Sequence, residues 1–230
     1  MIRFYLTFAL LLTSFGLTAQ SVNQDFGIWS KAKISYKLGD FRPFFNLSHR
    51  TDNNSEDLES FIVQVGTSYK LNKHFKFSLG LRSTYEPNID GNGVQSYRYI
   101  LDAKYYQKIK KFNFSFRNRF QTTYQFLEQA NPVNRFMIKI ERKIIKKLTG
   151  FVANEWFLRL VDTQGVHFDR YRIYSGLEYR VNKRLDIAVK YIRINRLALS
   201  DRFNMHIISA SGSYLLKFKK KKKAESKLQL

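Results

Sequence analysis

Hydrophobic and polar residues alternate with a period of two along most of this chain. In residues 168–192 the apolar series is Tyr171, Ile173, Leu177, Tyr179 and Val181, and the series between them is Arg170, Arg172, Glu178 and Arg180. Successive side chains of a β-strand leave opposite faces of the pleat. The alternation therefore predicts a strand with one apolar face and one charged face.

The same period recurs in segments spread over the chain. The clearest are residues 28–38, 61–71, 75–85, 112–121, 185–191 and 206–218. Short turns are expected near 39–40, 72–74, 108–111, 145–148 and 182–184. Longer polar loops are expected near 51–60, 86–96, 127–134, 161–168 and 196–203. Short turns at one end of the strands and longer loops at the other are typical of outer-membrane barrels.

We therefore predict an all-β fold, an antiparallel up-and-down transmembrane β-barrel. Eleven alternating runs can be counted, whereas single-chain bacterial barrels have even strand numbers. We expect 10–12 strands, with twelve preferred. If the apolar face of each strand is the outer one, then lipid surrounds Phe77, Leu79, Ile187 and Val189, and the side chains of Arg82 and Lys190 face the lumen.

The alternative fold is a soluble antiparallel sandwich, whose strands also alternate. The chain contains 21 Phe and 14 Tyr, and most of them fall on the apolar face or at its ends. A membrane barrel needs this arrangement for its lipid-facing band and aromatic girdles. The opposite face carries more Arg and Lys than a solvated face requires, so the membrane barrel is favoured.

The first residues predict export. Arg3 precedes an apolar run from Phe4 to Leu12, and small or polar residues follow up to Ala19. This is the pattern of a cleaved signal peptide, and the run is shorter than the roughly 20 apolar residues of a transmembrane helix. We predict a signal peptide over residues 1–19, a barrel over 20–218 and a Lys-rich tail over 219–230. The predicted location is the outer membrane of a Gram-negative cell envelope.

Charge narrows the choice of partners. Lys and Arg number 40 against 18 for Asp and Glu, and the formal net charge is +22. Such a chain attracts anions of any kind, but export argues against nucleic acid. The chain has no cysteine, which excludes disulfides and thiolate metal sites.

Several short motifs, taken together, are similar to those of a known family. They are Ala153-Asn154-Glu155-Trp156-Phe157, Phe168-Asp169 with Arg172, Gly176-Leu177-Glu178-Tyr179, a strand ending at Tyr191, and Trp29 and Arg50 nearer the N-terminus. This set resembles an uncharacterised family of bacterial outer-membrane β-barrels, designated domain of unknown function 2490. The resemblance implies a location and a fold, and it supplies no activity.

Glu155 and Arg172 are the most informative charged pair. Both lie on the polar, lumen-facing phase of neighbouring predicted strands, and a hairpin centred between Thr163 and Gln164 places them directly opposite each other. Arg159 and Arg170 are expected close by. A narrow barrel must neutralise charges that it buries, so a structural ion pair is preferred here over a catalytic or ligand-binding role.

Other candidate chemistry is weaker. His167 with Asp169 is the best candidate for a lipid-processing enzyme, but it lacks a nucleophile in a recognisable arrangement. The acidic stretch Asp52, Glu56, Asp57 and Glu59 has no fixed spacing of metal ligands and is expected to be a solvated loop. We therefore expect no cofactor, no metal site and no enzymatic activity.

Basic residues gather at the predicted short turns. They are Lys73, Lys108, Lys110, Lys111, Lys143, Lys146, Lys147, Lys183 and Arg184, and Lys219 to Lys223 join them in the tail. This basic rim is expected on the periplasmic side, where it can attract anionic lipid headgroups or wall polymer. Outer-membrane lipids and the barrel-assembly machinery are further expected partners.

Three functions remain open from the sequence. The first is a structural or interaction protein of the envelope that acts through the basic rim. The second is a narrow anion-selective pore or anion-binding barrel that uses the excess cations of the lumen. The third is a lipid-processing membrane enzyme.

Overall fold

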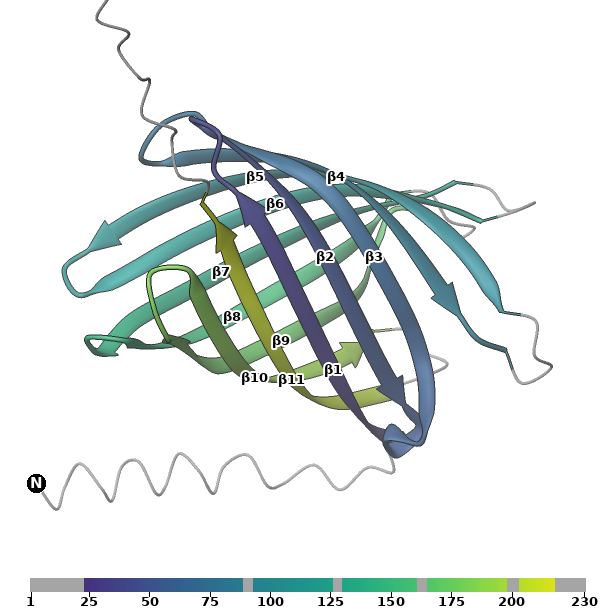
Figure 1. The fold of residues 1–230 in the computed structure, drawn as a ribbon. Helices are drawn as coiled ribbons and strands as arrows, with labels where there is room; N and C mark the ends of the chain where they lie inside the picture. Colours follow the sequence, from purple (N-terminus) through teal and green to yellow (C-terminus); the bar gives the residue numbers. More distant parts are fainter. Residues whose placement is uncertain (1–22, 89–92, 126–129, 161–164, 198–202, 218–230) are drawn as a thin grey trace, which may run out of the picture.

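The computed structural model describes residues 23–88, 93–125, 130–160, 165–197 and 203–217. In this part of the chain, eleven strands close into one barrel (Figure 1). The strands are β1 (Asn23–Tyr36), β2 (Phe41–Asp52), β3 (Asp57–Lys70), β4 (Phe75–Glu86), β5 (Val94–Ile109), β6 (Phe112–Gln125), β7 (Asn131–Ile145), β8 (Leu148–Arg159), β9 (His167–Arg180), β10 (Leu185–Arg196) and β11 (Phe203–Leu216). The prediction of an all-β barrel is confirmed. The predicted signal peptide and the Lys-rich tail lie outside the described residues.

The preference for twelve strands is wrong, because the described chain forms eleven. Strands that follow one another in sequence pair antiparallel, so an odd number brings the first and last strands together in the same direction. β1 and β11 accordingly pair in parallel from Asn23–Phe203 to Tyr36–Leu216, and their arrows lie side by side in Figure 1. The barrel is therefore antiparallel except at this one seam.

The short turns gather at one end of the barrel, which we call the turn end. Asn72 and Asn182 begin two similar turns, in which each side-chain oxygen accepts two backbone N–H groups, from His74 and Phe75 in one turn and from Arg184 and Leu185 in the other. Asn side chains stabilise turns in this way. The short turns predicted near 72–74 and 182–184 are confirmed.

The other end, which we call the loop end, differs from the prediction at residues 51–60. β2 and β3 extend through most of this range, and only a single 3₁₀ turn at Asn53–Ser55 with Glu56 lies between them. The Asp25 carboxylate accepts the backbone N–H groups of Asn53 and Asn54 at 3.2 and 2.8 Å. These bonds fix the turn, so the polar residues here continue the hairpin instead of forming a long loop.

The barrel is apolar outside and polar inside. Leu79 and Val189 on the outer face are 52% and 57% exposed, whereas Glu155 on the inner face is 0% exposed. This is the reverse of a soluble domain, and it suits a sheet whose surroundings are hydrocarbon. The predicted phase is confirmed, since Phe77 and Ile187 are also exposed outside and Arg82 and Lys190 line an internal cavity. Among the described residues, no helix has the length and apolar character needed to span a membrane.

Candidate functional site

Glu155 is the centre of the best connected group of polar side chains in the lumen. Arg135 of β7 donates to both of its carboxylate oxygens, from Nε at 3.0 Å and from Nη2 at 2.8 Å. Arg117 of β6 forms a second ion pair with it, and the Tyr174 hydroxyl of β9 donates at 2.6 Å. Arg135 also donates from Nη1 to Gln121 at 3.1 Å. A fully buried carboxylate needs such partners to remain charged.

The predicted register around Glu155 is correct, but its direct partners are different. Glu155 and Arg172 are opposite each other across β8 and β9, whereas the ion pairs of Glu155 among the described residues are with Arg117 and Arg135. Side chains on the inner wall converge toward the barrel axis, so residues of β6 and β7 reach the carboxylate as readily as its cross-strand neighbour does. Arg159 and Arg170, which were expected nearby, bind Asp169 at 3.5 and 2.6 Å.

Two buried aromatic rings hold the remaining arginines of this region. The Arg172 guanidinium lies 4.7 Å from the centre of the Phe157 ring and 5.3 Å from that of Trp29. Arg135 also lies over Phe157, at 4.2 Å, and Arg50 lies over Trp29, at 4.1 Å. Ring faces attract cations, most strongly where water is excluded. The rings thus retain positive charge inside the barrel without neutralising it.

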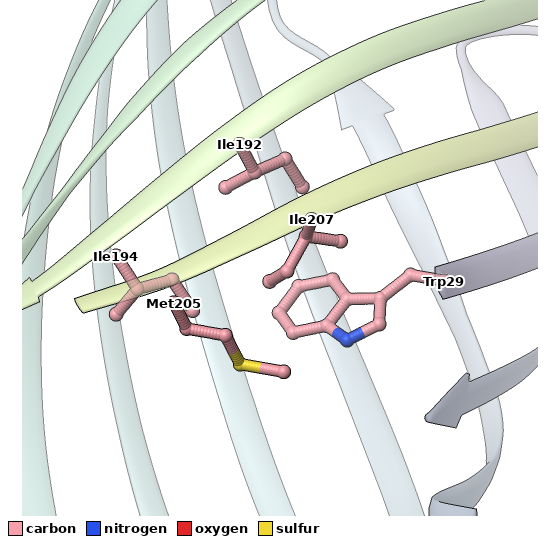
Figure 2. Close-up of a cluster of buried hydrophobic side chains, with 5 residues drawn as sticks. All are labelled: Trp29, Ile192, Ile194, Met205 and Ile207. Atoms are coloured by element: carbon pink, nitrogen blue, oxygen red, sulfur yellow. The ribbon is translucent and has the colours of Figure 1, made fainter. Parts of the chain in front are cut away.

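An apolar cluster fills part of the lumen near the loop end. Trp29 of β1, Ile192 and Ile194 of β10, and Met205 and Ile207 of β11 point toward one another (Figure 2) and are between 0% and 8% exposed. Charged side chains such as Arg82 and Lys190 were expected in the lumen from the sequence, whereas this apolar cluster was not. A signal for it was present, because Ile192 and Ile194 continue the inward phase of Lys190, and Trp29 continues that of Lys31.

A cavity in the lumen has a volume of about 520 Å³. Among the described residues, nine basic and two acidic side chains line it. The basic ones are Lys31, Arg50, Arg82, Lys104, Arg117, Arg135, Lys139, Arg172 and Lys190, and the acidic ones are Glu141 and Glu178. Trp29 and Ile192 form part of the wall, so the apolar cluster borders the cavity on the loop-end side.

Three of the lysines bring charge to the cavity without a neutralising partner. Within the described chain, Lys31, Lys104 and Lys190 have no carboxylate at ion-pair distance, whereas Arg117 and Lys139 bind Glu155 and Glu141. Lys31 is also exposed although it lies on the inner wall. An anion in the cavity therefore meets an excess of positive charge.

The basic rim lies where the sequence places it. Lys73, Lys108, Lys110, Lys111, Lys146, Lys147, Lys183 and Arg184 are all exposed and all lie in the turns or at the strand ends of the turn end. Lys143 is exposed too and lies in the last turn-end residues of β7. The predicted Lys219 to Lys223 extension of this rim lies outside the described residues.

His167 and Asp169, the side chains of the enzyme candidate, contact different groups within the described part of the chain. His167 Nδ1 lies 3.0 Å from the Gly165 carbonyl oxygen, and Asp169 is held by Arg170 and Arg159. In the acidic stretch, Glu59 accepts from the Trp29 indole at 3.0 Å and lies 3.8 Å from Arg50. No group of three or more metal-binding side chains occurs among the described residues.

Comparison with known proteins identifies the fold. Residues 26–202 match a family described as "Protein of unknown function (DUF2490)", and a search of curated proteins gave no match. The barrel is similar to the NanC porin, with a TM-score of 0.52 and 14% identity over 84% of this chain and 99% of that one. It is also similar to the β domain of the Bordetella autotransporter BrkA, with a TM-score of 0.47 and 10% identity over 77% and 84% of the two chains. For the KdgM porin the TM-score is 0.43 and the identity 15%, over 70% of this chain and 81% of that chain. At such identities the likeness concerns the fold.

Proposed function

This chain belongs to the DUF2490 family, and from the lumen of its barrel we propose that it is a narrow, anion-selective channel of the outer membrane. The observation that carries the proposal is the cavity in which nine basic side chains outnumber two acidic ones among the described residues. Walls of low dielectric constant focus the field of such charges and concentrate counter-ions between them. Lys31, Lys104 and Lys190 are the residues on which we expect a passing anion to depend.

The bore of the channel is expected to be small. An eleven-stranded barrel is narrower than the 16- to 18-stranded porins with aqueous channels, and the cluster of Trp29, Ile192 and Met205 occupies part of the lumen toward the loop end. The Arg135–Glu155–Arg117 group occupies more of it. Conductance should therefore be low, and small anions should pass more readily than large ones.

The proposed location is the outer membrane, reached through a cleaved signal peptide. Exposed apolar residues on the outer face support it, because in water they would form a far larger apolar patch than soluble proteins carry. The mature chain should fractionate with the outer membrane and migrate faster in detergent gels before heating than after heating. Recovery as a soluble species that needs neither lipid nor detergent would contradict the proposal.

Ion selectivity in planar bilayers tests the channel. Under a potassium chloride gradient, the reversal potential of the wild type should have the sign of a chloride-selective pore. Lys104→Glu combined with Lys190→Glu should move it toward the cation-selective sign, because both side chains line the cavity.

The matched control is Lys111→Glu combined with Lys183→Glu, which makes the same charge change on exposed turns and should have a much smaller effect. A wild-type channel without selectivity, or one that prefers potassium, would refute the proposal, as would equal effects of the two double variants.

The basic rim supports a second candidate, an envelope protein that contacts anionic lipid or wall polymer at its turn end. Each basic residue near an anionic surface contributes about 1 kcal/mol of attraction, and the eight rim residues named above are exposed. Co-sedimentation with phosphatidylglycerol vesicles and with wall polymer would test it. We continue to expect no catalysis, and a lipid-turnover assay with His167→Ala as comparison tests that expectation.

A further inference from the structure

A second polar cavity, of about 270 Å³, lies at the turn end of the barrel. Five basic side chains line it, and Asp40 is the one acidic side chain among its described lining residues. The basic ones are Lys37 of the β1–β2 turn, Arg42 of β2, Lys70 of β3, Lys73 of the β3–β4 turn and Lys76 of β4. Four of the five are exposed and Lys76 is partly buried, so the cavity is open to solution.

Hydrogen bonds between neighbouring turns hold the walls of this cavity in place. The Lys70 N–H donates to the Asp40 carbonyl at 3.0 Å, which ties the β1–β2 turn to β3. The Tyr106 N–H donates to the His74 carbonyl at 2.8 Å, which ties the β3–β4 turn to β5. The Asn72 side-chain oxygen is occupied by two backbone N–H groups, so the amide NH₂ is the donor that Asn72 can offer a ligand.

Positive charges in and beside the cavity directly oppose one another across the strands. Lys70 is paired in register with Lys76, Lys76 with Lys104, and Lys104 with Arg117. These four residues form a row of cations across β3, β4, β5 and β6. Like charges directly opposite each other destabilise a sheet. Arg117 is relieved by Glu155. Asp102 also attracts Lys76 and Lys104, but its ion pair is with Arg119. Among the described residues, Lys70, Lys76 and Lys104 take part in no ion pair.

We infer that this turn-end cavity is a binding site for a small soluble anion of the phosphate class with at least two negative charges, such as a diphosphate group. Such a ligand would relieve the opposed lysines that the protein itself leaves unpaired. Lysines act on phosphate as point charges, and Arg42 adds a planar fork that can bind two oxygens. The site goes beyond the proposed channel and does not depend on conduction.

The ligand comes from the solution and not from the bilayer. Arg42, Lys70 and Lys76 lie on the inner face, and the sheet with outward aromatic rings such as Phe41 and Tyr69, 4.9 Å apart, separates them from lipid. Tyr106 lines both this cavity and the larger one of the lumen. An anion held at the turn end therefore lies next to the lysines of the lumen.

Calorimetric titration with inorganic pyrophosphate tests the site on the full mature chain in an uncharged detergent at fixed ionic strength. One saturable site per barrel is expected. Lys70→Gln combined with Lys76→Gln should weaken binding by about tenfold or more, since two charge-assisted contacts are lost. Asp40→Asn should tighten binding, because it removes from the cavity wall a negative charge that repels the anion.

The matched control is Lys111→Gln combined with Lys183→Gln, which removes the same charge from exposed turns outside the cavity and should change affinity by less than about twofold. Heat-dependent gel migration shows whether each variant is folded. Absence of a saturable site in the wild type, or equal weakening by control and cavity variants, would overturn the inference. Displacement of pyrophosphate by phosphatidylglycerol vesicles, but not by free phosphate compounds, would assign the cavity to a lipid headgroup and would also overturn it.

Discussion

Replacing Glu155 with Gln should destabilise the barrel by about 3–5 kcal/mol, the usual cost of breaking a buried pair from one side. Glu155 is 0% exposed and accepts hydrogen bonds from Arg135 and Tyr174 while it also pairs with Arg117. The amide keeps the size of the side chain but removes its charge. Arg117 and Arg135 would then lie close together, with Arg172 nearby, in a space that contains no other acid bound to them among the described residues.

A double-mutant cycle identifies which arginine the carboxylate neutralises. Arg135 donates to both oxygens of Glu155, whereas Arg172 lies against Phe157 and Trp29. Glu155→Gln combined with Arg135→Met should recover a large part of the lost stability, with a coupling energy of about 1–3 kcal/mol. Combination with Arg172→Met should give a clearly smaller coupling energy.

The measurement is urea unfolding of the barrel in detergent micelles, followed by the loss of the fast-migrating folded band. Additive effects of Glu155→Gln and Arg135→Met would refute the assignment. Coupling to Arg172 as strong as coupling to Arg135 would restore the direct cross-strand pair that the sequence alone suggests.

Three further predictions concern the walls of the barrel. Trp29→Ala should raise single-channel conductance in bilayers, because the indole fills part of the apolar cluster next to the cavity; unchanged conductance would mean that this cluster is not the constriction. The thiol of Leu79→Cys should react with lipid-soluble reagents and not with aqueous ones, whereas the thiol of Lys190→Cys should react with small aqueous reagents. The opposite result would mean that the outer and inner faces of the barrel are exchanged. Gly66→Val should lower stability by about 1–3 kcal/mol in the same urea assay, because a Cβ at Gly66 would clash with the Leu79 carbonyl oxygen of β4 and would lie 2.7 Å from the Phe44 ring; a neutral result would show that the β4 backbone and the ring can both shift.

The parts of the fold that depend on local pattern could be predicted from the sequence. A period of two assigns each side chain to a face, so the sequence alone places Leu79 and Val189 outside and Arg82 inside, as the structure has them. A hairpin centre between Thr163 and Gln164 gives the pairing of Glu155 with Arg172, although a β-bulge at Phe157 and Leu158 shifts the register by one residue nearer the loop. Both inferences need only neighbouring strands.

The parts that depend on closure of the sheet could not be predicted in this way. Eleven alternating runs can be counted in the sequence, and eleven strands paired as hairpins bring β1 and β11 together in parallel. The count does not show that the sheet closes without a twelfth strand, which depends on all strands together. The partners of Glu155 depend on the radius of the barrel and on the stagger of its strands, which determine that Arg117 and Arg135 reach the carboxylate. The turn-end cavity likewise arises where separate turns meet.

The parallel pairing of β1 with β11 leaves the start of the first strand and the finish of the last strand at opposite ends of the barrel. Because the strand count is odd, Asn23 begins β1 at the loop end, whereas β11 finishes with Leu216 at the turn end. In a bilayer these two positions belong to different compartments. Epitopes inserted at Asn23 and at Lys217 would therefore be accessible to antibodies from opposite sides, and a circular permutation that joined the two ends would need a linker threaded through the lumen. During synthesis, the seam can form only when the last strand has arrived, because its two edges are the first and the last to be made.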